Sequence, residues 1–506
     1  MNYDEVEESR RRLSELLEAR GEWVVREGAS GVWVRRGEWE VRAAPGGLAF
    51  SYWGEAGSRV WRVARWEWRG GKLLLDATRR VGAVRARLEL VPRASAAEGA
   101  AVVAAARASA CARLAAMVAA QAAGARVERA RLSEGTRRGE PGRYARILLR
   151  RGRRLLAATG PVAPLGAGGA DALLVSGLLW YTRLAGRRRA EELKELWLLA
   201  PKGLARAVGE RLALLRAGWR EAVSLFEVDE EGAGLTRIDA PSLDELLARP
   251  APRLYRPATH ATSELAAGVV SLAPEAIDVV RARRGETLRF RGLPFARVRR
   301  VAGRERLWFG AGEAGARRPL EASNRGELLK LVAELSEHRR PDAPDRAHAL
   351  YRAAPEAWLE WLLRENITRL DPGLRLAPLH AQLRTPPGAV TARPVDLLAL
   401  RRNGRLVVIE LKVSGDAAHA LQGADYWRRI YAHHRAGHIR RARLFGDAEI
   451  SPDPPLVYLV APMLSFHRSF DTVARALRPD IEIYRFDLNE DWRSGVRVAH
   501  REAVAT

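Results

Sequence analysis

The sequence has little cysteine and no long apolar run, and each shortage excludes a class of protein. Cys111 is the single cysteine among 506 residues, so an internal disulfide is excluded, and its Ala-rich surroundings are typical of a small core residue. Arg107 and Arg113 interrupt the Ala-rich stretch 99–125, so no run approaches the roughly 20 apolar residues of a membrane-spanning helix. Residues 1–12 lack the apolar centre of a signal peptide. We therefore expect a cytoplasmic protein with no membrane partner.

A phosphate-binding loop of the Walker type is also missing, because Gly-x-x-x-x-Gly-Lys-Ser/Thr occurs nowhere in the chain. Any ATP-driven partner, such as a helicase acting in repair, would then be a separate chain.

Positive charge is what the sequence has in excess. The formal net charge is +24 and the isoelectric point is about 11.1. Such a charge attracts phosphate polyanions, and arginine adds bidentate phosphate contacts and stacking on bases. A genome rich in G and C would also raise the arginine content, and many arginines would then be merely solvated. We expect nucleic acid, in the first place DNA, as the partner.

Two short apolar runs near the C-terminus contain charged residues. The runs 394–400 and 405–413 are joined by Arg402-Asn403-Gly404, and Asn-Gly is a strong signal for a β-hairpin. The hairpin would fold Asp396 toward Glu410, and the two-residue period of a strand puts Glu410 and Lys412 on one face. Charged groups in a buried strand are costly unless they are paired or bound to a metal, and a divalent cation relieves the repulsion between two carboxylates.

Lys412 is notable because lysine is rare in this chain. Only five of the 85 basic residues are lysine and the other 80 are arginine. An ammonium group is a compact point charge, which can approach a phosphate oxygen or an attacking water in a way that a planar guanidinium cannot.

Asp396 followed by Glu410-Leu411-Lys412 resembles the PD-(D/E)XK nuclease superfamily, whose pattern is an acidic residue, a gap, and (D/E)-x-K on the next strand. The nearest likeness is to the C-terminal domain of archaeal-type mismatch and single-strand endonucleases, sometimes grouped with RecB-like nucleases. An upstream helix at 355–366 and a following helix with Gln422 and Tyr426, four residues apart on one face, carry the likeness further. It covers residues 348–506.

The resemblance implies a restriction-endonuclease-like fold and a Mg²⁺ or Mn²⁺ cofactor. Asp396 and Glu410 would be metal ligands together with the Leu411 carbonyl, and Lys412 would orient or activate the attacking water. Glu356 would complete the acidic cluster, although Glu360 lies on the same helix face and stays an alternative.

The remaining catalytic-site residues that the likeness implies are Gln422 and Tyr426. The chain departs from the family pattern by an insertion at 385–391 and by the order Pro394-Val395-Asp396, neither of which removes a ligand. The alternative is an ion pair at a strand end in an unrelated α/β domain.

The chain should contain several domains of mixed α/β (α+β) class. We expect a β-rich domain at 1–95 that begins with a helix at Tyr3–Arg20, an α/β domain at 96–250, a small β-containing unit at 251–337, a linker at 338–347 and the nuclease-like domain at 348–506. The last should have a central mixed sheet flanked by helices.

Seven of the fifteen tryptophans lie in the first domain. Beside arginines, as in 59–69, they would either stack on unpaired bases or form the core, and the core is expected because Trp is mostly buried.

The middle domain repeats the order of helices and strands expected for the nuclease-like domain. Its hairpin at 151–160 can be laid on 403–412 without a gap, which puts Tyr144, Ala158 and Gly160 where Asp396, Glu410 and Lys412 stand. The hypothesis is a second nuclease-like fold without a catalytic set, kept for binding or pairing. The alternative is chance similarity between two α/β domains.

His433, His434 and His438 suggest a zinc site, but no cysteine lies nearby and the spacing fits solvated residues on a polar helix.

Two functions follow from these patterns. The first is a metal-dependent DNA endonuclease, selective for strand or structure, in repair, recombination or defence. The second is a non-catalytic nucleic-acid-binding or scaffold protein with an inactive nuclease-like domain. The sequence leaves open DNA or RNA, the substrate structure and the oligomeric state, and a homodimer would suit cleavage of both strands.

Overall fold

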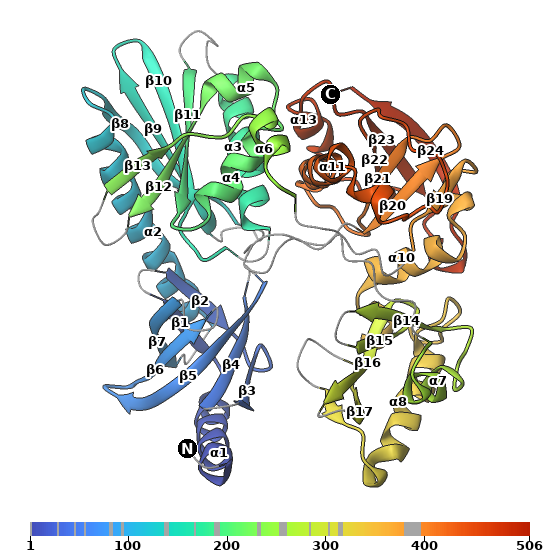
Figure 1. Cartoon of the computed structure of the whole chain (residues 1–506). Coiled ribbons are helices and arrows are strands. Elements are labelled where there is room, and N and C mark those ends of the chain that lie inside the picture. Colours follow the sequence, from blue (N-terminus) through green and yellow to red (C-terminus); the bar gives the residue numbers. More distant parts are fainter. Residues whose placement is uncertain are drawn as a thin grey trace. The chain divides into compact units, whose positions relative to one another are not determined.

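The computed structural model describes residues 3–505 except 28–29, 45–46, 55–56, 80–83, 93–95, 136–140, 166–167, 187–192, 230–233, 252–260, 283–284, 302–303, 312–316 and 379–395. The described residues form four β-sheets with helices packed against them, so the chain is a mixed α/β protein of several domains (Figure 1). The described residues divide into two compact units, one up to residue 241 and one from residue 242 onward, except that 214–216 count with the second. Each unit contains an antiparallel sheet followed by a six-stranded mixed sheet.

The first unit opens with a helix and a seven-stranded antiparallel sheet in the order β2-β1-β7-β6-β5-β4-β3. Its elements are α1 (Tyr3–Arg20), β1 (Trp23–Glu27), β2 (Ser30–Val34), β3 (Trp39–Ala44), β4 (Gly47–Gly54), β5 (Gly57–Arg69), β6 (Lys72–Arg79) and β7 (Val84–Pro92). The predicted bounds of the first helix are confirmed. Leu13 and Leu17 of this helix pack on the sheet beside Trp23 and Trp61, which are fully buried. These tryptophans therefore form core and not a stacking platform for bases.

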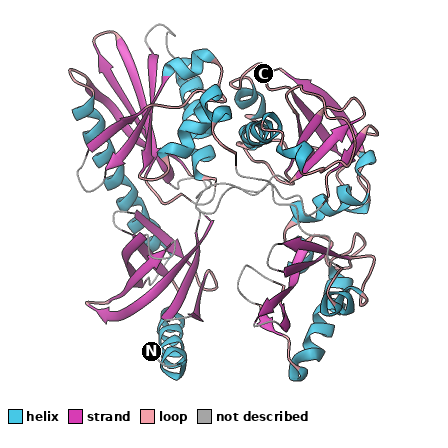
Figure 2. Ribbon diagram, in the orientation of Figure 1, coloured by secondary structure: helices cyan, strands magenta, loops and turns pink. Residues whose placement is uncertain are grey.

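The middle domain has a six-stranded sheet in the order β13-β12-β11-β10-β9-β8. Its elements are α2 (Ala96–Gln121), β8 (Arg126–Glu134), β9 (Pro141–Arg151), β10 (Arg154–Pro161), α3 (Gly169–Ala185), β11 (Leu193–Pro201), α4 (Ala205–Leu212), α5 (Ala217–Ala222), β12 (Val223–Asp229) and β13 (Gly234–Ile238). One face of the sheet packs on α2 through a cluster that includes Ile147 and Leu199, and the other face carries α3 and α4 (Figure 2). The domain is thus a sheet between two helical layers.

Helix α2 corrects one expectation from the sequence. Over Ala101–Gln121 it is long and apolar enough to span a membrane by length and composition, in spite of Arg107 and Arg113. Cys111, Leu114 and Val118 of this helix pack on the sheet of the middle domain, as the core helix of a globular domain does. Cys111 is buried there, as a core residue should be.

The second unit begins with a five-stranded antiparallel sheet in the order β14-β15-β16-β17-β18. Its elements are α6 (Leu243–Ala248), α7 (Glu264–Val270), β14 (Ile277–Ala282), β15 (Gly285–Phe290), β16 (Leu293–Val301), β17 (Arg304–Phe309), β18 (Arg318–Pro319), a 3₁₀ turn (Ala322–Asn324) and α8 (Arg325–His338). Leu328, Val332 and Leu335 of α8 cover the sheet. The segment 251–337, for which the sequence predicted a small β-containing unit, thus contains this sheet.

The predicted linker 338–347 is not a loose connection. Arg339 is fully buried, and its guanidinium donates hydrogen bonds to backbone carbonyls on both sides of the segment. The acceptors are the carbonyls of Phe290, Arg291, Leu350, Ala353 and Ala354. Burial lowers the pKa of Arg339 to about 9. The charge and proline content of this segment predicted a linker and gave no sign that Arg339 is buried in the core.

The C-terminal domain has a six-stranded sheet in the order β19-β20-β21-β22-β23-β24. Its elements are α9 (Ala349–Arg352), α10 (Pro355–Glu365), a 3₁₀ turn (Ile367–Arg369), β19 (Leu374–Leu376), β20 (Leu397–Arg401), β21 (Leu406–Leu411), α11 (His419–Arg435), α12 (His438–Arg441), β22 (Leu456–Pro462), α13 (Phe470–Ala474), β23 (Ile483–Leu488), a 3₁₀ turn (Trp492–Ser494) and β24 (Val498–Val504). The 385–391 insertion and residues 393–395 of the motif lie outside the described residues.

The two six-stranded sheets have the same topology. In each, the first three strands in chain order are antiparallel neighbours, the next two add in parallel, and the last is antiparallel at the edge. The order of elements inferred from the sequence of the two regions is therefore present in space.

In strand β10, the gap-free overlay of the two hairpins is wrong by one residue. Ala158 packs in the cluster with α2, and a Cβ added at Gly160 would lie 3.4 Å from Leu114 of the same helix. Glu410, the proposed counterpart of Ala158, lies on the opposite face of its own sheet, the face that carries α11. Since strand side chains alternate between faces, a slip of one residue reverses the side on which every residue lies.

Candidate active site

The hairpin of β20 and β21 places the predicted acidic residues. The amide of Gly404 donates to the carbonyl of Arg401 at 2.9 Å, and Gly404 has φ = 77°, a left-handed conformation that suits glycine in a tight turn. Leu397 pairs with Ile409 across the hairpin, so Asp396 and Glu410 are the next pair along the two strands. The turn thus brings together two carboxylates that are 14 residues apart in the sequence.

Three of the predicted residues meet at this point. Glu410 and Lys412 are 1% and 8% exposed, and the Lys412 ammonium donates to Glu410 Oε1 and, at 3.3 Å, to the Leu411 carbonyl. Asp396 is partly buried, and its Oδ2 accepts the amide hydrogen of Leu411 at 2.9 Å. The cluster is a compact network with both carboxylates beside one ammonium.

The electrostatics of the cluster follow from burial. Burial raises the pKa of Asp396 above that of an ordinary aspartate. Burial and the nearby Asp396 charge raise the pKa of Glu410 well above its usual value. Burial by itself would lower the pKa of Lys412, but the charges of Glu410 and Asp396 outweigh it and raise that pKa. The lysine therefore stays charged, while the carboxyl pair favours an added proton or cation.

The oxygen atoms of the cluster suit a hard divalent cation. Glu410 Oε2 and Gln422 Oε1 are buried and have no hydrogen-bond partner in the described part of the chain. Outside the gaps, no three His, Cys, Asp or Glu side chains are grouped as a metal site. Two carboxylates and the Leu411 carbonyl would supply the oxygen ligands that Mg²⁺ or Mn²⁺ prefers, with water completing the shell. The residues therefore fit a cation with only two acidic ligands.

Helix α11 presents the other two predicted residues to the same face. Gln422 and Tyr426 are buried, and burial together with Glu410 and Asp396 raises the pKa of the Tyr426 hydroxyl. The Nε2 of Gln422 donates to Asp416 Oδ2 at 3.2 Å. A Cβ added at Gly423 would lie 2.6 Å from the Leu459 side chain, so glycine lets α11 lie close against β22. This close approach positions Tyr426 beside the acidic pair and Gln422 beside Asp416.

On helix α10, the structure favours Glu360 over Glu356. Glu360 contributes to the raised pKa of Asp396, after the larger effect of burial, whereas Glu356 contributes no such influence. Glu360 also accepts from Arg364 at 2.7 Å and pairs with Arg289. Spacing could not separate the two glutamates, since residues four apart share a helix face. The choice between the two glutamates, which the sequence left open, stays a prediction, and this contact favours Glu360.

Sequence reasoning missed two residues that support the cluster. His419 is buried, and its Nε2–H donates to the Glu410 carbonyl at 3.2 Å. Burial lowers the pKa of His419 to about 3, so the ring is neutral. Asp416 accepts from the Ala418 amide at 2.8 Å as well as from Gln422. An acidic residue just before a helix was the available signal for Asp416, and nothing in the sequence marked His419.

The histidines of α11 and α12 differ from the solvated residues that the sequence suggested. His433 is buried, and its Nδ1 lies 3.1 Å from Nδ1 of His438. Burial lowers the pKa of His433 to about 4. The contact between buried His433 of α11 and half-buried His438 of α12 is a packing feature of these two helices.

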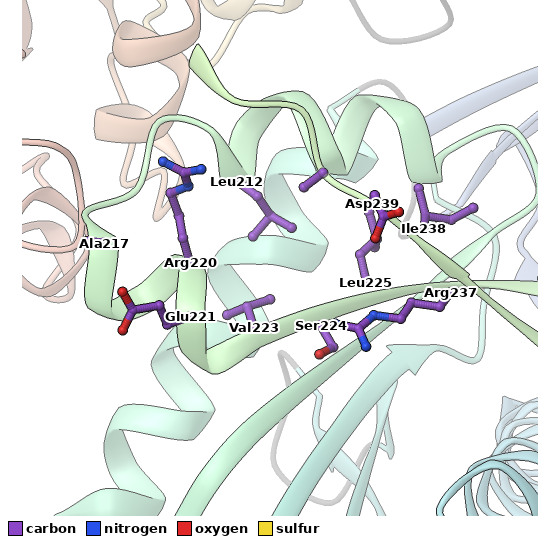
Figure 3. Close-up of a pocket in the computed structure, with 11 residues that line it drawn as sticks. Leu212, Ala217, Arg220, Glu221, Val223, Ser224, Leu225, Arg237, Ile238 and Asp239 are labelled. Carbon is purple, nitrogen blue, oxygen red and sulfur yellow. The ribbon is translucent and has the colours of Figure 1, made fainter. Parts of the chain in front are cut away.

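The middle domain contains a separate pocket of about 350 Å³. It is lined by residues of α4, α5, β12 and β13, among them Arg220, Glu221, Arg237 and Asp239 (Figure 3). Two arginines and two carboxylates balance its charge, and none of the predicted catalytic residues lines it. The pocket is therefore separate from the C-terminal cluster.

Comparisons of the chain with protein-family models, with curated proteins and with solved structures found no match. A proposal for the function of the protein therefore rests on the geometry of the C-terminal cluster.

Proposed function

We propose that this chain is a metal-dependent endonuclease that hydrolyses phosphodiester bonds in DNA, with a restriction-endonuclease-like C-terminal domain. One observation carries the proposal: the carboxylates of Asp396 and Glu410 lie beside each other and beside the Lys412 ammonium in one buried cluster. Carboxylates whose pKa values are raised, next to a charged lysine, are typical of sites that act on charged substrates.

The arrangement of the C-terminal sheet supports the fold assignment. A hairpin carries the acidic residues, a helix follows it, and two parallel strands complete the sheet centre. This combination of a hairpin site with a crossover helix matches the resemblance on which the proposal rests.

The roles of the side chains follow from their contacts. Asp396, Glu410 and the Leu411 carbonyl would hold Mg²⁺ or Mn²⁺. Such a cation supplies Lewis acidity, lowers the pKa of water and offsets negative charge on the phosphate. Lys412 keeps its proton, so it donates a hydrogen bond either to a phosphate oxygen or to the attacking water.

Side chains of helix α11 would form hydrogen bonds to the substrate and to water in the site. Tyr426 keeps its hydroxyl proton because burial and the two carboxylates raise its pKa, so it acts as a hydrogen-bond donor. Gln422 is held through Nε2 by Asp416, which leaves Oε1 to accept a hydrogen bond from water. His419 fixes the backbone of Glu410 and is a positioning residue.

DNA is the substrate class that the net charge of +24 favours, and strand- or structure-selective cutting in repair, recombination or defence is the proposed use. The protein would act in the cytoplasm, as a monomer or a homodimer, with any helicase supplied by another chain.

A second candidate is a nucleic-acid-binding scaffold without catalysis. The observation that favours it is the ion pair between Lys412 and Glu410, which would satisfy both charges without a metal or substrate.

The test is cleavage of end-labelled single-stranded, duplex, mismatched and forked DNA, and of an RNA strand, with Mg²⁺, Mn²⁺ or EDTA. Glu410→Gln and Lys412→Ala are compared with Lys330→Ala, which changes an exposed lysine of α8. We expect metal-dependent cutting that both site variants lose and the control keeps. DNA binding without cutting under every condition would support the scaffold instead.

A further inference from the structure

The middle domain offers a second site at the position that corresponds to the candidate active site. Its sheet has the same strand order and directions as the C-terminal sheet. Each sheet also carries a helix that packs closely on a central strand through one glycine. A Cβ added at Gly177 of α3 would lie 2.6 Å from Leu198, as one added at Gly423 would lie 2.6 Å from Leu459. These contacts supply a common reference point in the two domains.

Strand register then identifies the corresponding residues. Glu410 pairs with Leu459 in the C-terminal sheet, and Thr159 pairs with Leu198 in the middle sheet, so Thr159 corresponds to Glu410. Thr159 pairs across its hairpin with Arg146, which therefore corresponds to Asp396. On the helices, counting three residues on from each glycine makes Trp180 the counterpart of Tyr426.

The side chains at this position differ in charge between the two domains. Where the C-terminal domain has two carboxylates, the middle domain has a threonine and an arginine. The Thr159 hydroxyl donates to the Ala145 carbonyl at 2.7 Å, so it is already used within the sheet. The domain lacks an acidic pair at this position, so it has no ligands there for a divalent cation.

Arg146 is part of a cluster of three arginines. Arg131 of β8 pairs with Arg146 across the sheet, and Arg183 lies in the last turn of α3, where its Nε donates to the Leu179 carbonyl at 3.2 Å. Arg146 is half-buried, its guanidinium lies 5.9 Å from the centre of the Trp180 ring, and its Nε has no hydrogen-bond partner in the described residues. Arg131 and Arg183 are exposed.

The positive charges of the three arginines are not neutralised by other residues of the cluster. Burial, followed by the charges of Arg183 and Arg131, lowers the pKa of Arg146 to about 10, and Glu134 acts weakly in the opposite direction. Three like charges held together favour an anion with several oxygen acceptors, and the guanidinium group suits phosphate.

We propose that Arg131, Arg146 and Arg183 bind a backbone phosphate of nucleic acid, and that the middle domain is a non-catalytic copy that holds the substrate. The choice of nucleic acid as ligand rests on the proposed function of the C-terminal domain. The site itself is independent of any metal, since it binds an anion through arginine alone.

The experiment measures DNA binding by the full chain carrying Glu410→Gln, in EDTA, by anisotropy of labelled single-stranded and duplex DNA over a range of salt concentrations. The variant pair Arg131→Ala with Arg183→Ala removes the two exposed charges, and Arg146→Met tests the half-buried one. The control pair Arg153→Ala with Arg154→Ala removes two exposed arginines at the hairpin turn of the same domain, away from the cluster.

We expect the cluster pair to weaken binding about tenfold and to reduce the slope of log K against log salt by about one for each lost phosphate contact. Arg146→Met should act in the same direction, and the control pair should change affinity less than about threefold. Equal losses in the cluster and control pairs would overturn the proposal, because binding would then be diffuse. Displacement of DNA by inorganic phosphate at concentrations where chloride has no effect would also overturn it, in favour of a free-phosphate site.

The two proposals fail differently. If the chain with Glu410 intact cuts no nucleic acid but the cluster pair loses binding, the nuclease proposal fails and the arginine site stands. If the chain cuts DNA and the cluster pair binds as the control does, the arginine site fails and the nuclease proposal stands.

Discussion

The middle and C-terminal domains have the same sheet topology and opposite charge at the same position. In one, Glu410 pairs along the sheet with Leu459, and in the other Thr159 pairs with Leu198. Apolar residues on both faces of each sheet build the fold, while the polar residues at the strand ends differ. The shared sheet topology therefore fixes the position of a site in each domain, whereas the side chains at that position determine its chemistry.

The largest expected difference between the two domains is in catalysis. Glu410→Gln and Lys412→Ala should each reduce metal-dependent cleavage by about 1,000-fold or more, because each removes a charge that acts on the reacting phosphate or its metal. Thr159→Ala, at the corresponding position, should leave the rate of single-turnover cleavage unchanged. A comparable loss of rate in Thr159→Ala would show that the middle domain takes part in the chemistry.

The second expected difference concerns how each antiparallel sheet joins its mixed-sheet domain. The first unit uses the long helix α2, while the second uses the buried Arg339. Arg339→Met should destabilise the second unit by about 4 kcal/mol, since it leaves several buried carbonyls without a donor.

Urea unfolding of the full chain, followed by hydrogen exchange in each unit, measures this effect. The matched change Arg340→Met, at a partly exposed neighbour, should cost less than about 1 kcal/mol. Equal effects of the two changes would contradict a structural role for Arg339.

The third prediction sharpens the correspondence of Gly177 and Gly423. Valine at either position would be overpacked against a leucine of the neighbouring strand and should cost about 3 kcal/mol in its own domain. Only Gly423→Val should also slow cleavage, because α11 carries Gln422 and Tyr426. Hydrogen exchange in α3 and α11 separates the two effects, and Gly218→Val, where a Cβ meets no neighbour, is the control. Unequal destabilisation by the two valines would break the proposed correspondence.

The smallest predicted difference is in pH dependence. All ten histidines lie after residue 241, so histidine titration can affect only the second unit. The pKa of His433 is about 4 in the folded protein, against about 6.5 in an unfolded chain. Between these values the unfolded state binds the extra proton, so the stabilising effect is present above pH 6.5 and is lost as pH falls toward 4.

The loss can reach about 3 kcal/mol for a shift of this size. His433→Gln should reduce the pH dependence of hydrogen exchange in α11 over this window, to which the lowered pKa of His419 also contributes, while the exposed His500→Gln should not. An unchanged profile in His433→Gln would exclude this histidine as the cause.

Local signals in the sequence were sufficient for much of the fold. The first helix, Tyr3–Arg20, is a run of charged residues with leucines at helical spacing, and its bounds are as expected. The turn at Asn403-Gly404 and the apolar run Leu406–Leu411 define the hairpin, because turn residues and the apolar composition of a strand depend only on neighbouring residues. The restriction-endonuclease-like assignment stays a prediction.

Other features depended on which face of an element meets its neighbours. Glu356 and Glu360 lie on one helix face, so the sequence could not separate them. The packing of α10 decides that the charge of Glu360 contributes to the raised pKa of Asp396. The burial of Arg339 and His433 could not be predicted from the sequence, because both residues are polar and are held by contacts from distant segments.

The sequence by itself determined where the candidate acidic residues and lysine stand, because strand period and turn chemistry are local. Tertiary structure alone decided that Arg146 and Thr159 correspond to Asp396 and Glu410, since strand register is set by cross-strand pairing and a shift of one residue reverses the face. It also decided which charges are desolvated, and hence which pKa values are shifted, because burial is a property of the packed core.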